Sequence, residues 1–282
     1  MYKIVLAMLA VSLPILAARI TVAPGQSPEP AERDVRGGHS TNDISLVAQP
    51  LPGPPAILEN AGGQDTCIAV ARQATTAKQC EIDPNQRITG SRIEGFLVRN
   101  FSGDGIFLLC ADEWAVMSNT AVHNTAGILT FILPQEDVML SRGNHVHHNF
   151  VYENNSPNSC LDPADDVCAV PPGIGILVVG GDHNEIDNNR AVGNQTFGVA
   201  LSDLCTAFGF PANLCPLFQF AAIPQFTKIR QNNGIGNGAS PGSAGKPGAD
   251  LIWSENGKGN CWQENQALIV SPNQLPACKS AP

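Results

Sequence analysis

The sequence predicts an all-β chain that forms a right-handed parallel β-helix, a solenoid of about five to six coils with one long apolar insertion and several disulfides. Three observations support this prediction. Charged residues make up only 15% of the 282 residues, and there are 27 Gly and 22 Pro, a composition typical of strands and turns. A short pattern of aliphatic residues and asparagines recurs along the chain. A glycine- or aspartate-led aliphatic segment follows its copies.

The first pattern consists of an aliphatic residue, two residues, Asn, two residues, an apolar residue, one residue and Asn. One coil cannot bury its own apolar positions, so coils stack and the apolar positions of the pattern form internal columns. Asn suits the bends because it tolerates left-handed backbone angles, and stacked copies can bond as a ladder. An Asn-rich β-sandwich with accidental spacing is the alternative. Four full copies and a fifth partial copy begin at Val116, Val146, Ile186, Ile229 and Trp262.

The second pattern places an aliphatic strand after a Gly or Asp, and its uninterrupted spacing suits one solenoid coil. Counting from the glycines, the outward residues Phe107, Leu129 and Leu177 are as apolar as the inward ones, so this face needs a cover. The apolar insertion 204–226 is the expected cover, and a partner protein or an apolar ligand is the alternative. The strands begin at Gly105, Gly127, Gly175, Gly198 and Asp250.

The chain divides into three parts. Residues 1–18 combine an N-terminal lysine, an apolar run and small residues, which predicts a signal peptide and a secreted protein, extracellular or periplasmic; an uncleaved anchor is the alternative. No later segment reaches the ~20 apolar residues of a membrane span. Residues 19–59 are rich in Pro and Gly and predict a largely disordered leader. Residues 60–282 form the predicted β-helix domain.

Nine cysteines in an exported chain predict disulfides. Connectivity does not follow from sequence, and neighbouring cysteines could pair differently. Cys110 is left over and follows an apolar run, so we expect a buried thiol. The four close pairs are Cys67 with Cys80, Cys160 with Cys168, Cys205 with Cys215, and Cys261 with Cys278.

Three segments carry a family resemblance: 94–103 (EGFLVRNFSG), 182–189 (DHNEIDNN), and the closing 260–265 (NCWQEN) with 275–278 (LPAC). Through them the chain resembles the right-handed β-helix repeat proteins of the pectate-lyase-like superfamily, especially the secreted bacterial group, over about residues 60–278. The resemblance implies the fold and, more weakly, polysaccharide chemistry. Segment 23–27 (APGQS) looks like the leading coil of this group, but Pro and Glu residues follow it, so we expect its N-terminal coils to be lost.

Candidate site residues follow from the expected register. If the first positions of the copies face inward, their neighbours face outward, and equivalent residues stack at about 4.8 Å. Carboxylates or histidines can transfer a proton, and Lys or Arg can hold a uronate carboxylate. A charge ladder that stabilises strand pairing by ~0.2 to 1 kcal/mol per pair is the alternative. The candidate catalytic residues are His145, Glu185 and Lys228 in one column, and His147, Asp187 and Arg230 in the next.

Metal, phosphate and nucleophile chemistry receive less support. His145, His147 and His148 could ligate a metal, but no further Cys or His is spaced to complete a site. Segment 160–168 offers Asp oxygens for calcium, the one cofactor left open, yet lacks a dedicated loop pattern. The one Gly-x-Ser-x-Gly match, 238–242 (GASPG), lies in a stretch rich in Gly and Pro, and serines sit mostly in turns, so nucleophile chemistry gets no support. No phosphate-cradling loop occurs.

Two functions remain open. The first is a polysaccharide-binding or polysaccharide-processing protein, lyase- or epimerase-like, that acts on uronate-containing glycans. The second is a non-catalytic envelope or extracellular β-helix that binds glycans or proteins. The net charge of −9 argues against nucleic-acid binding, because phosphate neutralisation needs clustered Lys and Arg. The same charge disfavours a polyanionic glycan unless a local basic strip or a cation offsets it.

Overall fold

The structure is a computed structural model in which strands dominate the described residues. The predicted signal peptide, the Asp162 to Asp166 segment and the cysteines at 67, 80, 110 and 160 lie outside them. Within the described ranges, no helix is long and apolar enough to cross a membrane. The structure describes residues 19–22, 45–48, 56–60, 68–70, 88–109, 111–132, 141–159, 168, 170–218, 221–239 and 247–279.

The strands form three all-parallel sheets, which we call A, B and C, and a two-stranded parallel pair, β5 (Ile88–Thr89) with β9 (Ala111–Asp112). Sheet A has the order β1 (Arg19–Val22), β2 (Ser45–Ala48), β6 (Arg92–Glu94), β10 (Ala115–Met117), β13 (His145–His147), β16 (Glu185–Asp187), β19 (Lys228–Arg230) and β21 (Cys261–Gln263). Sheet B has the order β3 (Ala56–Glu59), β7 (Phe96–Arg99), β11 (Thr120–Val122), β14 (Phe150–Tyr152) and β17 (Arg190–Val192). Sheet C has the order β4 (Ile68–Val70), β8 (Asp104–Leu109), β12 (Ala126–Phe131), β15 (Ile174–Val179), β18 (Phe197–Ser202), β20 (Ala249–Trp253) and β22 (Val270–Ser271).

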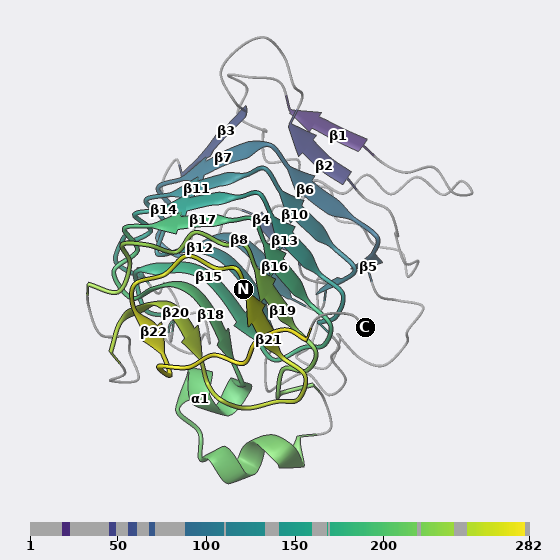
Figure 1. The fold of residues 1–282 in the computed structure, drawn as a ribbon. Helices are drawn as coiled ribbons and strands as arrows, with labels where there is room; N and C mark the ends of the chain where they lie inside the picture. Colours follow the sequence, from purple (N-terminus) through teal and green to yellow (C-terminus); the bar gives the residue numbers. More distant parts are fainter. Residues whose placement is uncertain are drawn as a thin grey trace.

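The chain visits the sheets in rotation. Strands β10, β11 and β12 lie in sheets A, B and C in turn, and the next triplets β13 to β15 and β16 to β18 repeat that order. Each strand pairs in parallel with the equivalent strand of the next triplet, so the triplets stack (Figure 1). This arrangement is consistent with the predicted parallel β solenoid.

The predicted internal column of sheet A is confirmed. Val116 pairs with Val146, Val146 with Ile186, Ile186 with Ile229, and Ile229 with Trp262. The four aliphatic side chains are 0% exposed. Because one residue of slip would turn every side chain to the other face, this burial fixes the register of the sheet.

Sheet B differs from the expectation by one residue. Ala121, Val151 and Ala191 are fully buried. Of the apolar positions of the pattern, Val122 is 3% exposed, whereas Tyr152 and Val192 are only partly buried. Side chains alternate along the strand, starting from the inward Asn. The second residue after that Asn therefore faces inward, and the third residue faces outward. Two of the three inward residues are alanines, whose hydrophobic signal is weak.

Buried asparagines form ladders at two corners, as the repeat predicts. At the first corner each side-chain amide donates to the next Oδ1 at 3.0–3.1 Å and to a backbone carbonyl. The residue with the left-handed backbone conformation precedes the ladder Asn, as at Ser118, His148 and Asn188. The ladder Asn therefore supplies buried hydrogen bonds and does not itself form the bend. The ladders consist of Asn119, Asn149, Asn189, Asn232 and Asn265, and of Asn124, Asn154, Asn194 and Asn237.

The segment 19–59, expected to be a largely disordered leader, contributes β1, β2 and β3 to the sheets. Strand β2 pairs with β6, and β3 pairs with β7. Ala48 and Leu58 belong to the buried core cluster that includes Ile93 and Val98 of the first coil. Short apolar stretches in this segment therefore add strands at the N-terminal edge, and the sheets begin before residue 60.

The outer face of sheet C carries a second apolar cluster. Phe107, Leu129 and Leu177 belong to it, together with Leu204 and Cys215 from the segment that follows β18. This segment holds α1 (Leu204–Phe208) and a 3₁₀ helix (Ala212–Leu217), at the lower end of Figure 1. The Phe131 and Phe208 ring centroids are 5.7 Å apart, so the segment packs on the face that needs a cover.

Two of the suggested disulfides are confirmed. Cys205 pairs with Cys215 within the segment that packs on sheet C, and Cys261 pairs with Cys278 at the last described coil. Cys168 is also disulfide-bonded.

Candidate functional site

The structure brings all six predicted site residues together on the outer face of sheet A. Strand pairing aligns His145 with Glu185 and Glu185 with Lys228. The neighbouring column aligns His147 with Asp187 and Asp187 with Arg230. We call these six residues the outer strip. Their positions follow from the inward column, since each lies directly beside a fully buried aliphatic residue.

Asp187 lies at the centre of the outer strip. Its Oδ1 hydrogen-bonds His145 Nε2 across the columns, and its Oδ2 accepts a hydrogen bond of 3.2 Å from Asn188 Nδ2. The guanidinium of Arg230 lies 4.0 Å from the same Oδ2. The Asp187 side chain is only 13% exposed, whereas that of His145 is 40% exposed. The Asp187 carboxylate is therefore fixed in position between a histidine and an arginine.

Glu185 forms ion pairs with both cations of the outer strip. Lys228 Nζ donates to its Oε1 at 2.8 Å, and Arg230 donates to its Oε2 at 3.2 Å. The Lys228 hydrogen bond, with further attraction from both cations, holds the pKa of Glu185 below its ordinary value even though partial burial opposes the shift. Both basic groups therefore already have a carboxylate partner.

His147 stands apart from these ion pairs. Its ring stacks on that of His145 with centroids 4.0 Å apart, and its Nδ1 lies 2.9 Å from Nδ1 of His148. Partial burial, with repulsion from His145, lowers the pKa of His147 below its ordinary value. His147 is therefore set to be a neutral imidazole near neutral pH.

Two neighbours of the outer strip were not among the predicted site residues. His148 and Asn188 occupy the left-handed corner directly after β13 and β16, and each contacts the strip residue that precedes it. The sequence repeat could have identified them, because in every copy the residue before the ladder Asn directly follows the outward residue that ends the strand.

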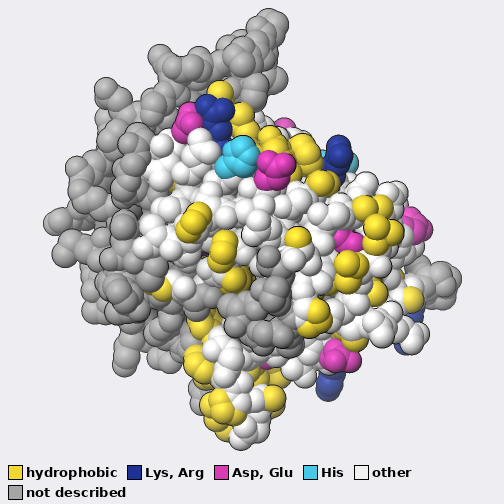
Figure 2. Space-filling view, turned by 90° about the vertical axis from the view of Figure 1, so that its left-hand side faces the viewer, with side chains coloured by type: hydrophobic (Ala, Val, Ile, Leu, Met, Phe, Trp, Pro, Cys, Tyr) yellow, Lys and Arg dark blue, Asp and Glu magenta, His cyan; other side chains and the backbone are white. Residues whose placement is uncertain are grey.

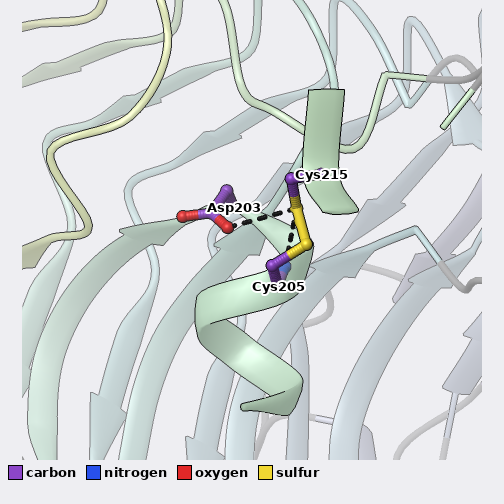
Figure 3. A group of neighbouring side chains, drawn as sticks. All are labelled: Asp203, Cys205 and Cys215. Carbon is purple, nitrogen blue, oxygen red and sulfur yellow. Dashed lines mark hydrogen bonds between the residues drawn. A yellow bond between two sulfur atoms is a disulfide. The ribbon is translucent and has the colours of Figure 1, made fainter. Parts of the chain in front are cut away.

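One other cluster contains metal-ligand side chains. Within the described ranges, Asp203, Cys205 and Cys215 alone form a group of three with ligand atoms within 4.8 Å of one another. Figure 3 shows that the two sulfurs are bonded to each other, and Asp203 Oδ1 accepts from the Thr206 N–H as the N-cap of α1. Since disulfide sulfurs offer no thiolate, the cluster is structural. The predicted Asp162, Asp165 and Asp166 calcium segment lies outside the described residues.

Figure 2 faces the side of sheet B, where the coloured part of the surface shows a few charged side chains, some of them next to a side chain of opposite charge, among hydrophobic and neutral ones. The lobe at the lower end is mainly hydrophobic and neutral. Residues 204–227 include no Asp, Glu, Lys, Arg or His. Phe210, Leu214 and Leu217 are exposed there. The outer strip is thus the densest group of proton-transfer and cationic side chains that the described residues contain.

No protein-family model, curated protein or solved structure matches this chain.

Proposed function

We propose that this chain is a secreted right-handed parallel β-helix protein, similar to the pectate-lyase-like group, that binds and processes uronate-containing polysaccharide along the outer strip of sheet A. The observation that carries the proposal is the grouping of His145, Asp187 and Arg230, in which a partly exposed carboxylate lies between an imidazole and a guanidinium. Disulfides in the described residues support export, because they persist in oxidising compartments.

The arrangement suits abstraction of the proton beside a sugar carboxylate. Arg230 would hold the substrate carboxylate and stabilise the negative charge that develops on it. Asp187 would accept the proton from the adjacent ring carbon, with His145 fixing its orientation. In a lyase the electron pair then forms the ring double bond while the glycosidic carbon–oxygen bond breaks and the leaving oxygen takes a proton. In an epimerase a water molecule would deliver a different proton to the opposite face of that carbon, and Asp187 would release the abstracted proton to solvent.

The spacing of the outer strip suits an extended ligand. Coil-to-coil spacing along the strip is about 4.8 Å, close to the length of one sugar residue, and the strip spans β13, β16 and β19. Lys228 is 49% exposed, so it can contact a second carboxylate further along the glycan. These local cations offset the net charge of −9, which otherwise repels polyanions.

A second candidate, a non-catalytic glycan-binding β-helix, is favoured by one observation. Glu185 pairs with both Lys228 and Arg230, which leaves less positive charge for stabilising a transition state. In this alternative the strip recognises a glycan by hydrogen bonds and holds it without proton transfer.

The test is incubation of the purified protein with pectate, alginate and glycosaminoglycans, with and without calcium, followed by ultraviolet absorbance of the unsaturated product. Epimerase activity is followed as solvent hydrogen exchange at the sugar carbon by NMR. The proposal expects one of these signals, and expects Asp187→Asn to abolish it with the fold intact. Glu153→Gln is the matched control, because that carboxylate is 60% exposed beside His123 after β14.

The outcomes separate the two candidates. Glycan binding that Arg230→Gln weakens, without product or exchange, would establish the non-catalytic module. Turnover unchanged in Asp187→Asn would exclude this carboxylate as the base. Absence of both binding and turnover with all three glycan classes would overturn the assignment of the outer strip.

A further inference from the structure

His147, a member of the outer strip, and its neighbour His148 form a pair of imidazoles that has no role in the proposed proton transfer. They are consecutive, but His147 ends β13 while His148 takes the left-handed backbone conformation, with φ of 54°. This bend turns the second side chain toward the first, although neighbours along a strand ordinarily point to opposite faces. The two Nδ1 atoms lie 2.9 Å apart, with ring planes at 84°.

We propose that His147 and His148 chelate a divalent transition-metal ion with a tetragonal preference, Cu(II) or Ni(II), through their Nδ1 atoms. Metal–nitrogen bonds to histidine are about 2.0–2.1 Å. Two nitrogens 2.9 Å apart that share one ion at that length subtend about 90° at the metal. A tetrahedral ion needs a separation of about 3.3 Å, so the pair fits square-planar or tetragonal coordination better than a zinc site.

The surroundings favour a neutral, oriented chelate. The His145 ring stacks on His147 at 4.0 Å and restricts its rotation, and His145 is itself held by Asp187. The contact between the two Nδ1 atoms is a hydrogen bond in which one Nδ1–H donates to the other nitrogen, so metal binding moves that proton to Nε2 of the same ring. His148 is exposed, so its ring can rotate until both Nδ1 lone pairs face a shared ion. Water completes the open coordination positions.

The inference does not depend on polysaccharide binding. A chelate of this kind does not need a third protein ligand. The lack of a further Cys or His at a suitable spacing therefore does not exclude it. The site also differs from the Asp203 cluster, whose sulfurs are joined in a disulfide.

The experiment titrates the purified full chain with copper sulfate by calorimetry and records electron paramagnetic resonance spectra. We expect one equivalent of Cu(II) with nitrogen coupling from two imidazoles. His147→Gln and His148→Gln should each weaken binding by about tenfold or more, whereas His123→Gln, an exposed histidine after β11, should bind as the parent does. Far-UV circular dichroism verifies that each variant is folded.

Two results would overturn the inference. Unchanged affinity and nitrogen coupling in both His147→Gln and His148→Gln would place any bound copper elsewhere. An equal loss in His123→Gln would show that copper binds surface histidines without a defined site.

Discussion

Removing an internal rung of the first asparagine ladder should cost far more than removing its last rung. Asn189 is 2% exposed and takes part in four side-chain hydrogen bonds: its Oδ1 accepts two from Asn149, and its Nδ2 donates to Val146 O and Asn232 Oδ1. A buried hydrogen bond contributes about 1 kcal/mol net. Asn189→Ala should therefore lower the free energy of unfolding by about 4 kcal/mol, because water cannot reach the groups left behind.

Asn265→Ala is the matched comparison. Asn265 takes part in three bonds, two accepted from Asn232 and one donated to Ile229 O, but it is half-buried, so water replaces part of the loss and about 1–2 kcal/mol is expected. Guanidinium denaturation followed by far-UV circular dichroism, with disulfides intact, measures both. Equal losses, or a loss below about 1 kcal/mol for Asn189→Ala, would refute the view that the ladder stabilises the stack.

Three further predictions concern single positions. Gly127→Ala should destabilise by about 1–3 kcal/mol in the same denaturation assay, because its Cβ would lie 2.6 Å from the carbonyl oxygen of Gly175; stability equal to the parent would contradict this. The pKa of Glu185 is lowered, so its bond to Lys228 stabilises the fold fully above pH 4.5, the ordinary value, and this stabilisation is lost as pH falls through the folded pKa. Glu185→Gln lacks this carboxylate, so it should lose less stability than the parent when the pH is lowered below 4.5. Burial raises the pKa of Asp182, so its ionisation opposes folding; Asp182→Asn should raise the melting temperature at pH 7 and lose that advantage in acid, and a lower melting temperature at pH 7 would count against it.

The sequence predicted the parts of the structure that repeat. The inward column of Val116, Val146 and Ile186 and the alignment of His147 with Asp187 follow from one spacing, because stacked coils force equivalent residues into contact. The ladder asparagines follow for the same reason. Knowing one inward residue was enough to place its neighbours on the outer face.

What does not repeat could not be predicted in this way. The strands β1, β2 and β3 have no counterpart in the repeated pattern. Strands β2 and β3 pair with the edge of the first coil, and β1 pairs with β2. The His147–His148 contact depends on a left-handed corner. The pairing of Glu185 with both Lys228 and Arg230 depends on side-chain rotamers, which strand alternation leaves open.

The excursion between β18 and β19 has a practical consequence. Ser202 ends one strand and Lys228 begins the next, yet Lys228 still pairs in register with Glu185. The neighbouring coil, and not the length of the connecting chain, sets where the strand resumes. A foreign loop exchanged for the native one at this corner would leave the histidines and carboxylates of the outer strip in place, provided that it also covers the apolar outer face of sheet C.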